Sequence, residues 1–315
     1  MTWFGAEIDG PMIVVRAIHF AATAVTAGAL MFRAVVAEPA LRCQRDASAI
    51  LEQQIRKVAW ISLAIAVVSG LAWVLLLTMS LSAEGPGEAV MSGALRDVLN
   101  LTQFGLISQI RLALAIALAI CLAFDRLAPA RWLALGLALG LIIAIAWTGH
   151  AGSTPYRLGD LHLAADALHL IAAAAWIGGL PSLVLLLAAV RGNKALAGAS
   201  VAQAAAQSFS TLGVVSVGTL LLSGIVNTWI LVGSFRGLLF DGYGIVLMLK
   251  LAVFAAMLGF AAVNRFWLTP QLAGSRDVAA LRQLIRNSVI EIVLGFVIFA
   301  IVGVLGTLHP ASHFL

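Results

Sequence analysis

Residues 160–187 read DLHLAADALHLIAAAAWIGGLPSLVLLL, an apolar run that is long enough to cross a bilayer and polar at its start. A hydrocarbon core of about 30 Å needs roughly 20 apolar residues in a helix. The first third nevertheless carries Asp160, His162, Asp166 and His169. Ionisable groups are costly in hydrocarbon, so they indicate a packed interior or a water-lined site. Asp166 and His169 share one face of the expected helix because they are three residues apart.

The middle of the same run offers a surface for close helix packing. Trp176 is followed by Ile177 and by the pair Gly178-Gly179. Small residues of this kind let the backbone of another membrane helix approach closely. We therefore expect a polar site at one end of this helix and a helix crossing at its centre, with Trp176 beside that crossing.

The composition predicts an all-α polytopic membrane protein. Hydrophobic residues make up 62% of the chain and charged residues 10%, whereas soluble domains have about 25% charged residues. The apolar runs are continuous, which excludes the alternating pattern of a β-barrel. Eight runs are expected to cross the membrane: 11–37, 57–80, 106–124, 131–150, 161–190, 208–233, 244–268 and 287–308.

The loop charges predict how the chain is oriented. Most loop lysines and arginines fall on the side that the first run reaches, and the opposite side has Arg96, Arg157 and Arg236. Cytoplasmic loops are enriched in these residues, so both termini are expected on the periplasmic side. The net charge of +5 then reflects topology, and nucleic acid is not an expected partner.

The chain also repeats its landmarks in the same order. His19 precedes Gly28 by nine residues, as His169 precedes Gly178. Further matched pairs follow along the two halves: Ser69-Gly70 with Ser223-Gly224, Phe104-Gly105 with Tyr243-Gly244, Arg111 with Lys250, and His150 with His309. The pattern predicts two four-helix halves, 1–150 and 151–315, that insert the same way up.

One matched pair carries opposite charges. Arg16 stands three residues before His19, and Asp166 stands three residues before His169. If the first and fifth helices meet on the axis that relates the halves, Arg16 and Asp166 are expected to neutralise each other.

All six histidines fall on the expected periplasmic side, which is the main chemical signal in the sequence. Imidazole is a good ligand for copper, zinc, iron and nickel. Four histidines come from the first and fourth helices of the halves and form the candidate metal site: His19, His150, His169 and His309. The alternative is that each ring donates to a backbone carbonyl and has no metal role.

For several other polar residues, a supporting role at the site and an ordinary structural role are both possible interpretations. Arg111 and Lys250 either snorkel to the interface or neutralise an anionic ligand. Glu291 either faces an inner pathway together with Asn264 or pairs with Arg286 or Asn287. His162 and His313, like Asp160, are either solvated surface groups or second-layer residues. Gly70 and Gly224 are expected to serve helix packing.

Several strings resemble the bacterial copper-resistance D membrane proteins, the CopD and PcoD family. They are DALHLIAAAAWIGGL at 166–180, LSGIVN at 222–227, YGIVLMLK at 243–250, NRFWLTP at 264–270 and SVIE at 288–291. Two strings in the first half match more weakly, RAIH at 16–19 and TGHA at 148–151. The copper-resistance D domain is expected over about 200–310. The resemblance implies an inner-membrane protein that moves copper inward from a periplasmic CopC-like carrier.

A second function remains open, because helical bundles with histidine pairs also bind haem b. His19 with His150, or His169 with His309, are the candidate axial pairs. We expect no enzyme activity for a copper carrier, and redox activity if haem is bound. A red preparation with a Soret band would favour haem, and a colourless one with bound copper would favour transport.

Overall fold

The computed structural model describes residues 2–3, 6–7, 9–41, 45–192, 198–274 and 278–310. Within these ranges, eight helical stretches are long and apolar enough to cross a membrane, which confirms the predicted number. They are Gly10–Leu41, Leu51–Ser82, Gln103–Ala123, Ala128–Thr148, Arg157–Arg191, Ser200–Leu231, Gly242–Leu272 and Val278–Leu305. All eight begin before the predicted boundary, because polar residues extend the helices beyond the apolar runs.

Several spans are built from consecutive helical segments. In the first half these are α1 (Gly10–Phe32), the π-helical turn η1 (Arg33–Ala37), α2 (Glu38–Leu41), α3 (Arg45–Ser82), α6 (Gln103–Ala123), α7 (Ala128–Ile143) and the 3₁₀ turn η2 (Ala144–Thr148). In the second half they are α8 (Tyr156–Ala173), the π-helical turn η4 (Ala174–Gly178), α9 (Leu180–Gly192), α10 (Gly198–Leu231), α12 (Gly242–Val263), the π-helical turn η5 (Asn264–Leu268), α13 (Thr269–Gly274) and α14 (Val278–Leu305).

The first helix has a well-defined start. The side chain of Asp9 accepts a hydrogen bond from the Met12 amide at 3.2 Å, and Pro11 occupies the first turn. An aspartate N-cap and an early proline both favour the beginning of a helix. The end of the bundle at which α1 begins is called the Gly10 end below, and the opposite end is called the Leu41 end.

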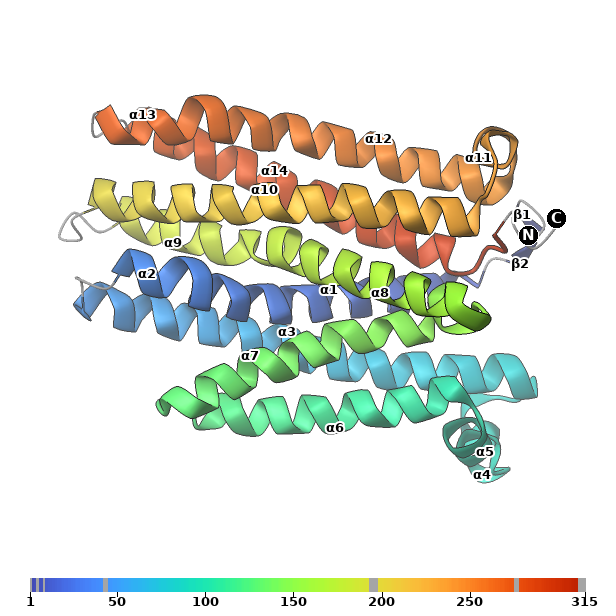
Figure 1. Cartoon of the computed structure of the whole chain (residues 1–315). Helices are drawn as coiled ribbons and strands as arrows, with labels where there is room; N and C mark the ends of the chain where they lie inside the picture. Colours follow the sequence, from blue (N-terminus) through green and yellow to red (C-terminus); the bar gives the residue numbers. More distant parts are fainter. Residues whose placement is uncertain are drawn as a thin grey trace.

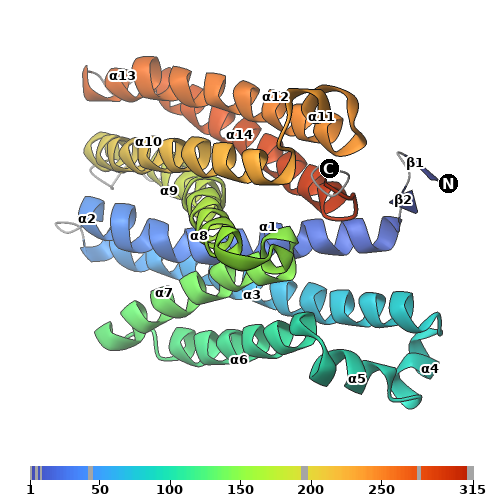
Figure 2. The same ribbon diagram turned by 45° about the vertical axis from the view of Figure 1, so that its right-hand side comes forward.

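The first helix lies at the centre of the bundle. Figure 1 shows α3, α6 and α7 on one side of α1 and α10, α12 and α14 on the other, and the turned view in Figure 2 agrees. The helices α1 and α14 pack against each other and against the short π-helical turn η4. Outward-facing positions such as Val68 and Leu222 are about 70% exposed, as expected for side chains that face lipid (68% and 70%).

The Gly10 end carries the short elements. The hairpin of β1 (Thr2–Trp3) and β2 (Ala6–Glu7) lies there with the end of α14 (Figure 1). Three short helices also lie there: α4 (Pro86–Met91), α5 (Ala94–Leu101) and α11 (Phe235–Phe240). The apolar runs did not predict α4 and α5, because such short amphipathic helices lack a membrane-length apolar run.

The first and fifth spans cross at matched glycines. A methyl group added to Gly28 would overlap the carbonyl oxygen of Ala174 and the backbone of Gly178. A methyl group added to Gly178 would overlap the carbonyl oxygen of Ala24. The two backbones are therefore in direct contact, which confirms the close approach predicted at Gly178.

Candidate functional site

His19 is held by the second span. Its Nδ1 lies 2.9 Å from the carbonyl oxygen of Ala66 and 3.1 Å from Oγ of Ser69, both on α3. Because the Ala66 carbonyl can only accept, Nδ1 carries the proton and Nε2 has the lone pair. Nε2 is buried and has no hydrogen-bond partner among the residues that the structure describes. The alternative of a ring bonded to a carbonyl is thus correct for one nitrogen of His19.

His169 has a matching environment in the fifth and sixth spans. Its Nδ1 lies 3.0 Å from Oγ of Ser223 on α10. The serine hydroxyl donates to the Thr219 carbonyl at 2.6 Å and so accepts from the imidazole. Fixing one ring nitrogen in this way leaves the other free to bind a ligand, as in many metal sites.

The glycines that follow the two serines face the imidazoles. A Cβ atom at Gly70 would lie 3.0 Å from Cε1 of His19, and one at Gly224 would lie 3.7 Å from Cε1 of His169. Both glycines are thus at contacts between helices, as expected, and each of them makes room for a histidine ring of the neighbouring helix.

Arg111 and Lys250 turn into the bundle. Arg111 is 7% exposed, and its Nη2 lies 3.5 Å from Oγ1 of Thr23, which itself donates to the His19 carbonyl at 2.8 Å. Snorkelling was therefore the wrong explanation for Arg111. Lys250 interacts electrostatically with both Asp166 and His169. Each histidine thus has a cationic side chain nearby.

The expected ion pair between Arg16 and Asp166 is not formed. Arg16 donates to the Gly306 carbonyl at 2.6 Å and lies over the Trp73 ring at 5.1 Å. Asp166 accepts from Asn227 at 3.3 Å. The prediction was wrong because the two side chains leave α1 and α8 toward different neighbouring helices.

The remaining histidines lie apart from one another. The His150 ring is 6.1 Å from the ring of Tyr243, a residue that also interacts electrostatically with Asp166. His162 is buried and bonded to Oγ1 of Thr154 at 2.8 Å. His309 is exposed beyond α14, and His313 lies outside the described residues.

The structure does not bring the four candidate ligands together. Within the described ranges, no three His, Cys, Asp or Glu side chains are grouped closely enough to hold a metal ion. The two axial pairs of the haem alternative, His19 with His150 and His169 with His309, stay a prediction. The fourth span instead brings His150 toward the Asp166 side of the second half.

A second polar cluster lies farther from the Gly10 end, between η5, α14 and η4. Glu291 is 2% exposed and accepts from Nδ2 of Asn264 at 2.6 Å. Trp176 is also a side-chain hydrogen-bond partner of Glu291. Asn287 reaches this carboxyl group indirectly, because it donates to Oδ1 of Asn264 at 3.0 Å. The expected partners Arg286 and Asn287 were therefore wrong as direct contacts.

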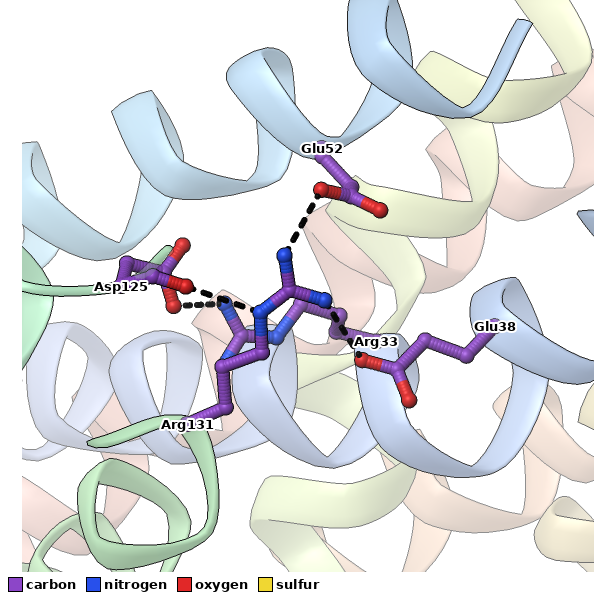
Figure 3. Close-up of polar contacts among 5 residues, drawn as sticks. All are labelled: Arg33, Glu38, Glu52, Asp125 and Arg131. Atoms are coloured by element: carbon purple, nitrogen blue, oxygen red, sulfur yellow. Dashed lines mark hydrogen bonds and ion pairs between the residues drawn. The ribbon is translucent and has the colours of Figure 1, made fainter. Parts of the chain in front are cut away.

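The sequence analysis missed a charged network at the Leu41 end (Figure 3). Arg33 and Asp125 form a buried ion pair at 2.6 Å, with side chains 4% and 8% exposed. Arg131 lies between Glu38 at 3.6 Å and Glu52 at 3.2 Å. A cavity of about 110 Å³ lies beside this network and away from the histidines. The sequence signal for this network is Arg33 itself, because a charged residue inside the predicted first helix, 11–37, indicates a buried partner.

The eight spans, with ionisable side chains buried between them, define a polytopic membrane protein. Residues 203–305 match the family Copper resistance protein D, and residues 7–159 match Copper resistance protein D-like, N-terminal domain. The chain belongs to the copper resistance protein D family, whose members include copper resistance and copper transport proteins. The match at 203–305 falls within the expected range of about 200–310, and the match at 7–159 extends the likeness across the first half.

Three relatives support this assignment. Copper resistance protein D of Pseudomonas syringae pv. tomato is 32% identical over 66% of this chain and 69% of the relative. Copper transport protein CutJ of Bacillus subtilis is 31% identical over 62% of this chain, but over only 37% of the longer relative. Inner membrane protein YebZ of Escherichia coli is 29% identical over 95% of this chain and 98% of the relative.

The relatives and the eight spans agree on location. This protein is a multi-pass protein of the bacterial inner membrane, as predicted. No solved structure matches the chain.

Proposed function

We propose that this protein carries copper across the inner membrane, from the Gly10 end toward the Leu41 end, and that it is a carrier and not an enzyme. The observation that carries the proposal is His169, whose Nδ1 is fixed by Ser223 while Asp166 stands one helical turn away. Imidazole suits copper, and a carboxylate compensates the charge of the bound ion. Membership of a copper family supplies the identity of the ion.

The second half is the better place for a copper ion. Asp166 is its acidic group, and Lys250 is the cation that interacts with it. An incoming copper ion competes with the Lys250 ammonium for Asp166, which favours release as well as binding. His150, close to Tyr243, stands where it can assist at this site.

The corresponding place in the first half is less suited to a cation. Arg16 stands where the second half has Asp166, and Arg111 interacts electrostatically with His19. Two guanidinium groups beside one imidazole repel a metal ion. Of the four candidate ligands we therefore assign the principal role to His169, and none to the exposed His309.

The two four-helix halves are proposed to be a parallel internal repeat, 1–150 and 151–315. The support is the matched contacts of His19 with Ser69 and of His169 with Ser223. The reciprocal contact of Gly28 and Gly178 is what an axis between equivalent helices would produce. We propose that both termini are periplasmic, on the basis of the loop charges. Alkaline phosphatase fused after Leu315 should be active, and an inactive fusion would reverse the proposed direction.

The route beyond His169 is proposed to pass the second polar cluster, where Trp176, Asn264 and Glu291 meet. A periplasmic CopC-like copper carrier is the proposed donor at the Gly10 end. The exposed His309 and the short helices at that end are the surfaces that such a donor would meet.

Copper accumulation tests the proposal. Cells that express the chain should accumulate more copper than cells with an empty vector, and His169→Ala should remove most of this excess. His162→Gln is the matched control, because His162 is bonded to Thr154 and outside the proposed path. Equal accumulation by wild type and His169→Ala, at equal protein levels, would contradict the assignment. A Soret band in the purified protein would instead favour haem.

A further inference from the structure

Glu291 is a carboxyl group surrounded by neutral partners in the interior of the bundle. It is 2% exposed, accepts from Asn264 at 2.6 Å and interacts with Trp176. The ion pairs found among the described residues are those of Arg33 and Arg131, with Asp125, Glu38 and Glu52. Within that part of the chain, no cationic side chain is therefore paired with Glu291.

Side-chain amides lead from Glu291 toward the Leu41 end. Gln283 donates to Asn287 at 2.8 Å, Asn287 donates to Asn264 at 3.0 Å, and Asn264 donates to Glu291. All three amides are oriented with their donors toward the carboxyl group. One turn before Glu291, Oγ of Ser288 is buried and has no hydrogen-bond partner within the described ranges. The cluster is thus polar enough to host a small cation, but it has no positive charge of its own.

The charged groups on the surrounding helices point elsewhere. Arg265 on η5 is exposed and donates to Oγ of Ser210 at 2.7 Å. Arg286 on α14 is exposed. The partners of Glu291 from η4 and η5 are Trp176 and Asn264, and the buried polar residues that precede it on α14 are Asn287 and Ser288. All four are neutral.

The first half also has a buried carboxylate, Asp125, but that carboxylate is paired with an arginine. Asp125 stands fourteen residues after Arg111, and Asn264 stands fourteen residues after Lys250, so Asp125 and Asn264 occupy matching positions in the two halves. Asp125 forms an ion pair with Arg33 at 2.6 Å. The second half has an amide at that position and its carboxyl group on α14, without a paired arginine.

We propose that Glu291 binds a proton and exchanges it for the transported copper(I) ion. A buried carboxylate without a cation is strongly unfavourable in a membrane, so the group holds a proton when copper is absent. When copper(I) arrives, the carboxyl O–H bond breaks, the proton leaves, and the carboxylate balances the charge of the ion. One proton is exchanged for one monovalent ion, and no electron is transferred.

This inference rests on the proposed copper transport and adds its coupling to protons. It is tested in proteoliposomes that contain a trapped pH-sensitive dye, with copper(I) added outside in a reducing buffer. Copper and protons should move in opposite directions, so the interior should become more alkaline whichever way the protein is inserted. Glu291→Gln should reduce this pH change to the level of empty liposomes. Glu52→Gln, which alters a half-exposed carboxylate, should leave it unchanged.

The outcomes separate the two proposals. If wild-type protein moves no copper, the proposed function fails. If wild-type protein moves copper without a pH change, or if Glu291→Gln retains the full pH change, the proton exchange is overturned. Measuring trapped copper in the same vesicles makes this distinction.

A copper-independent measurement covers the case in which Glu291→Gln does not fold. The infrared C=O stretch of a protonated carboxyl group should be present in copper-free wild-type protein. Glu291→Asp should retain such a band at a shifted frequency, and addition of copper(I) should remove the wild-type band. A copper-free spectrum that is identical in wild type and Glu291→Asp would contradict a proton on Glu291.

Discussion

Gly28 and Gly178 lie against each other's backbone where the first and fifth spans cross. Each glycine stands nine residues after the histidine of its own half, so equivalent positions meet each other. The contact fixes the distance between α1 and η4 at the centre of the bundle.

This crossing predicts a strong effect of a single methyl group. Gly28→Ala and Gly178→Ala should each destabilise the protein by about 3 kcal/mol, because the new Cβ meets backbone atoms that cannot rotate away. Thermal unfolding in detergent should show the loss. Gly218→Ala is the control, since a Cβ there meets nothing within 4 Å and alanine favours the helix. Equal unfolding temperatures for Gly28→Ala and Gly218→Ala would contradict the close crossing.

The two kinds of ion pair at the Leu41 end predict different costs. Asp125→Asn should destabilise the protein by about 3–5 kcal/mol, because it leaves the buried Arg33 uncompensated. Glu52→Gln should cost less than about 1 kcal/mol, because its pair with Arg131 is half-exposed. Replacing both Arg33 and Asp125 by leucine should recover much of the stability. A double variant no better than Asp125→Asn would count against a simple pair.

The two serines that hold the imidazoles predict a difference between the halves. Ser223→Ala should weaken copper binding about 10–100-fold, because it releases the ring of His169. Ser69→Ala releases His19 in the same way but should leave copper binding unchanged. Equilibrium titration with a copper(I) chelator measures both. The reverse pattern would place the copper site in the first half.

The contact between Asn264 and Glu291 predicts a stability effect that is separate from transport. Asn264→Leu removes the 2.6 Å donor from a buried carboxyl group and should cost about 1–3 kcal/mol. The double variant Asn264→Leu with Glu291→Leu should be more stable than Asn264→Leu alone, since no unpaired polar group remains. Unfolding of the three proteins would decide, and strictly additive losses would argue against direct coupling.

The helices and the central crossing could be predicted because they depend on local sequence. Membrane-length apolar runs set the eight spans, and the pair Gly178-Gly179 marked the surface for close approach. Family strings such as LSGIVN located the domain at 203–305. These signals need no knowledge of how the helices are rotated against one another.

The partners of the polar groups could not be predicted in the same way. Arg16 reaches the Gly306 carbonyl and Arg33 reaches Asp125, across 290 and 92 residues of sequence. Which side chains meet depends on the tilt and rotation of each helix, and spacing within one helix does not contain that information. The four histidines illustrate the point, because sharing one end of the bundle did not make them neighbours.

The bare backbone contact at Gly28 and Gly178 has a mechanical consequence. Neither glycine has a side chain that could interlock with the other helix, so the crossing angle can change at this contact with little repacking. A small change in crossing angle would swing the segments above and below it in opposite senses, opening one face of the membrane as the other narrows. Such a motion needs a fixed point of contact between the two helices, and the backbone contact of Gly28 and Gly178 provides it.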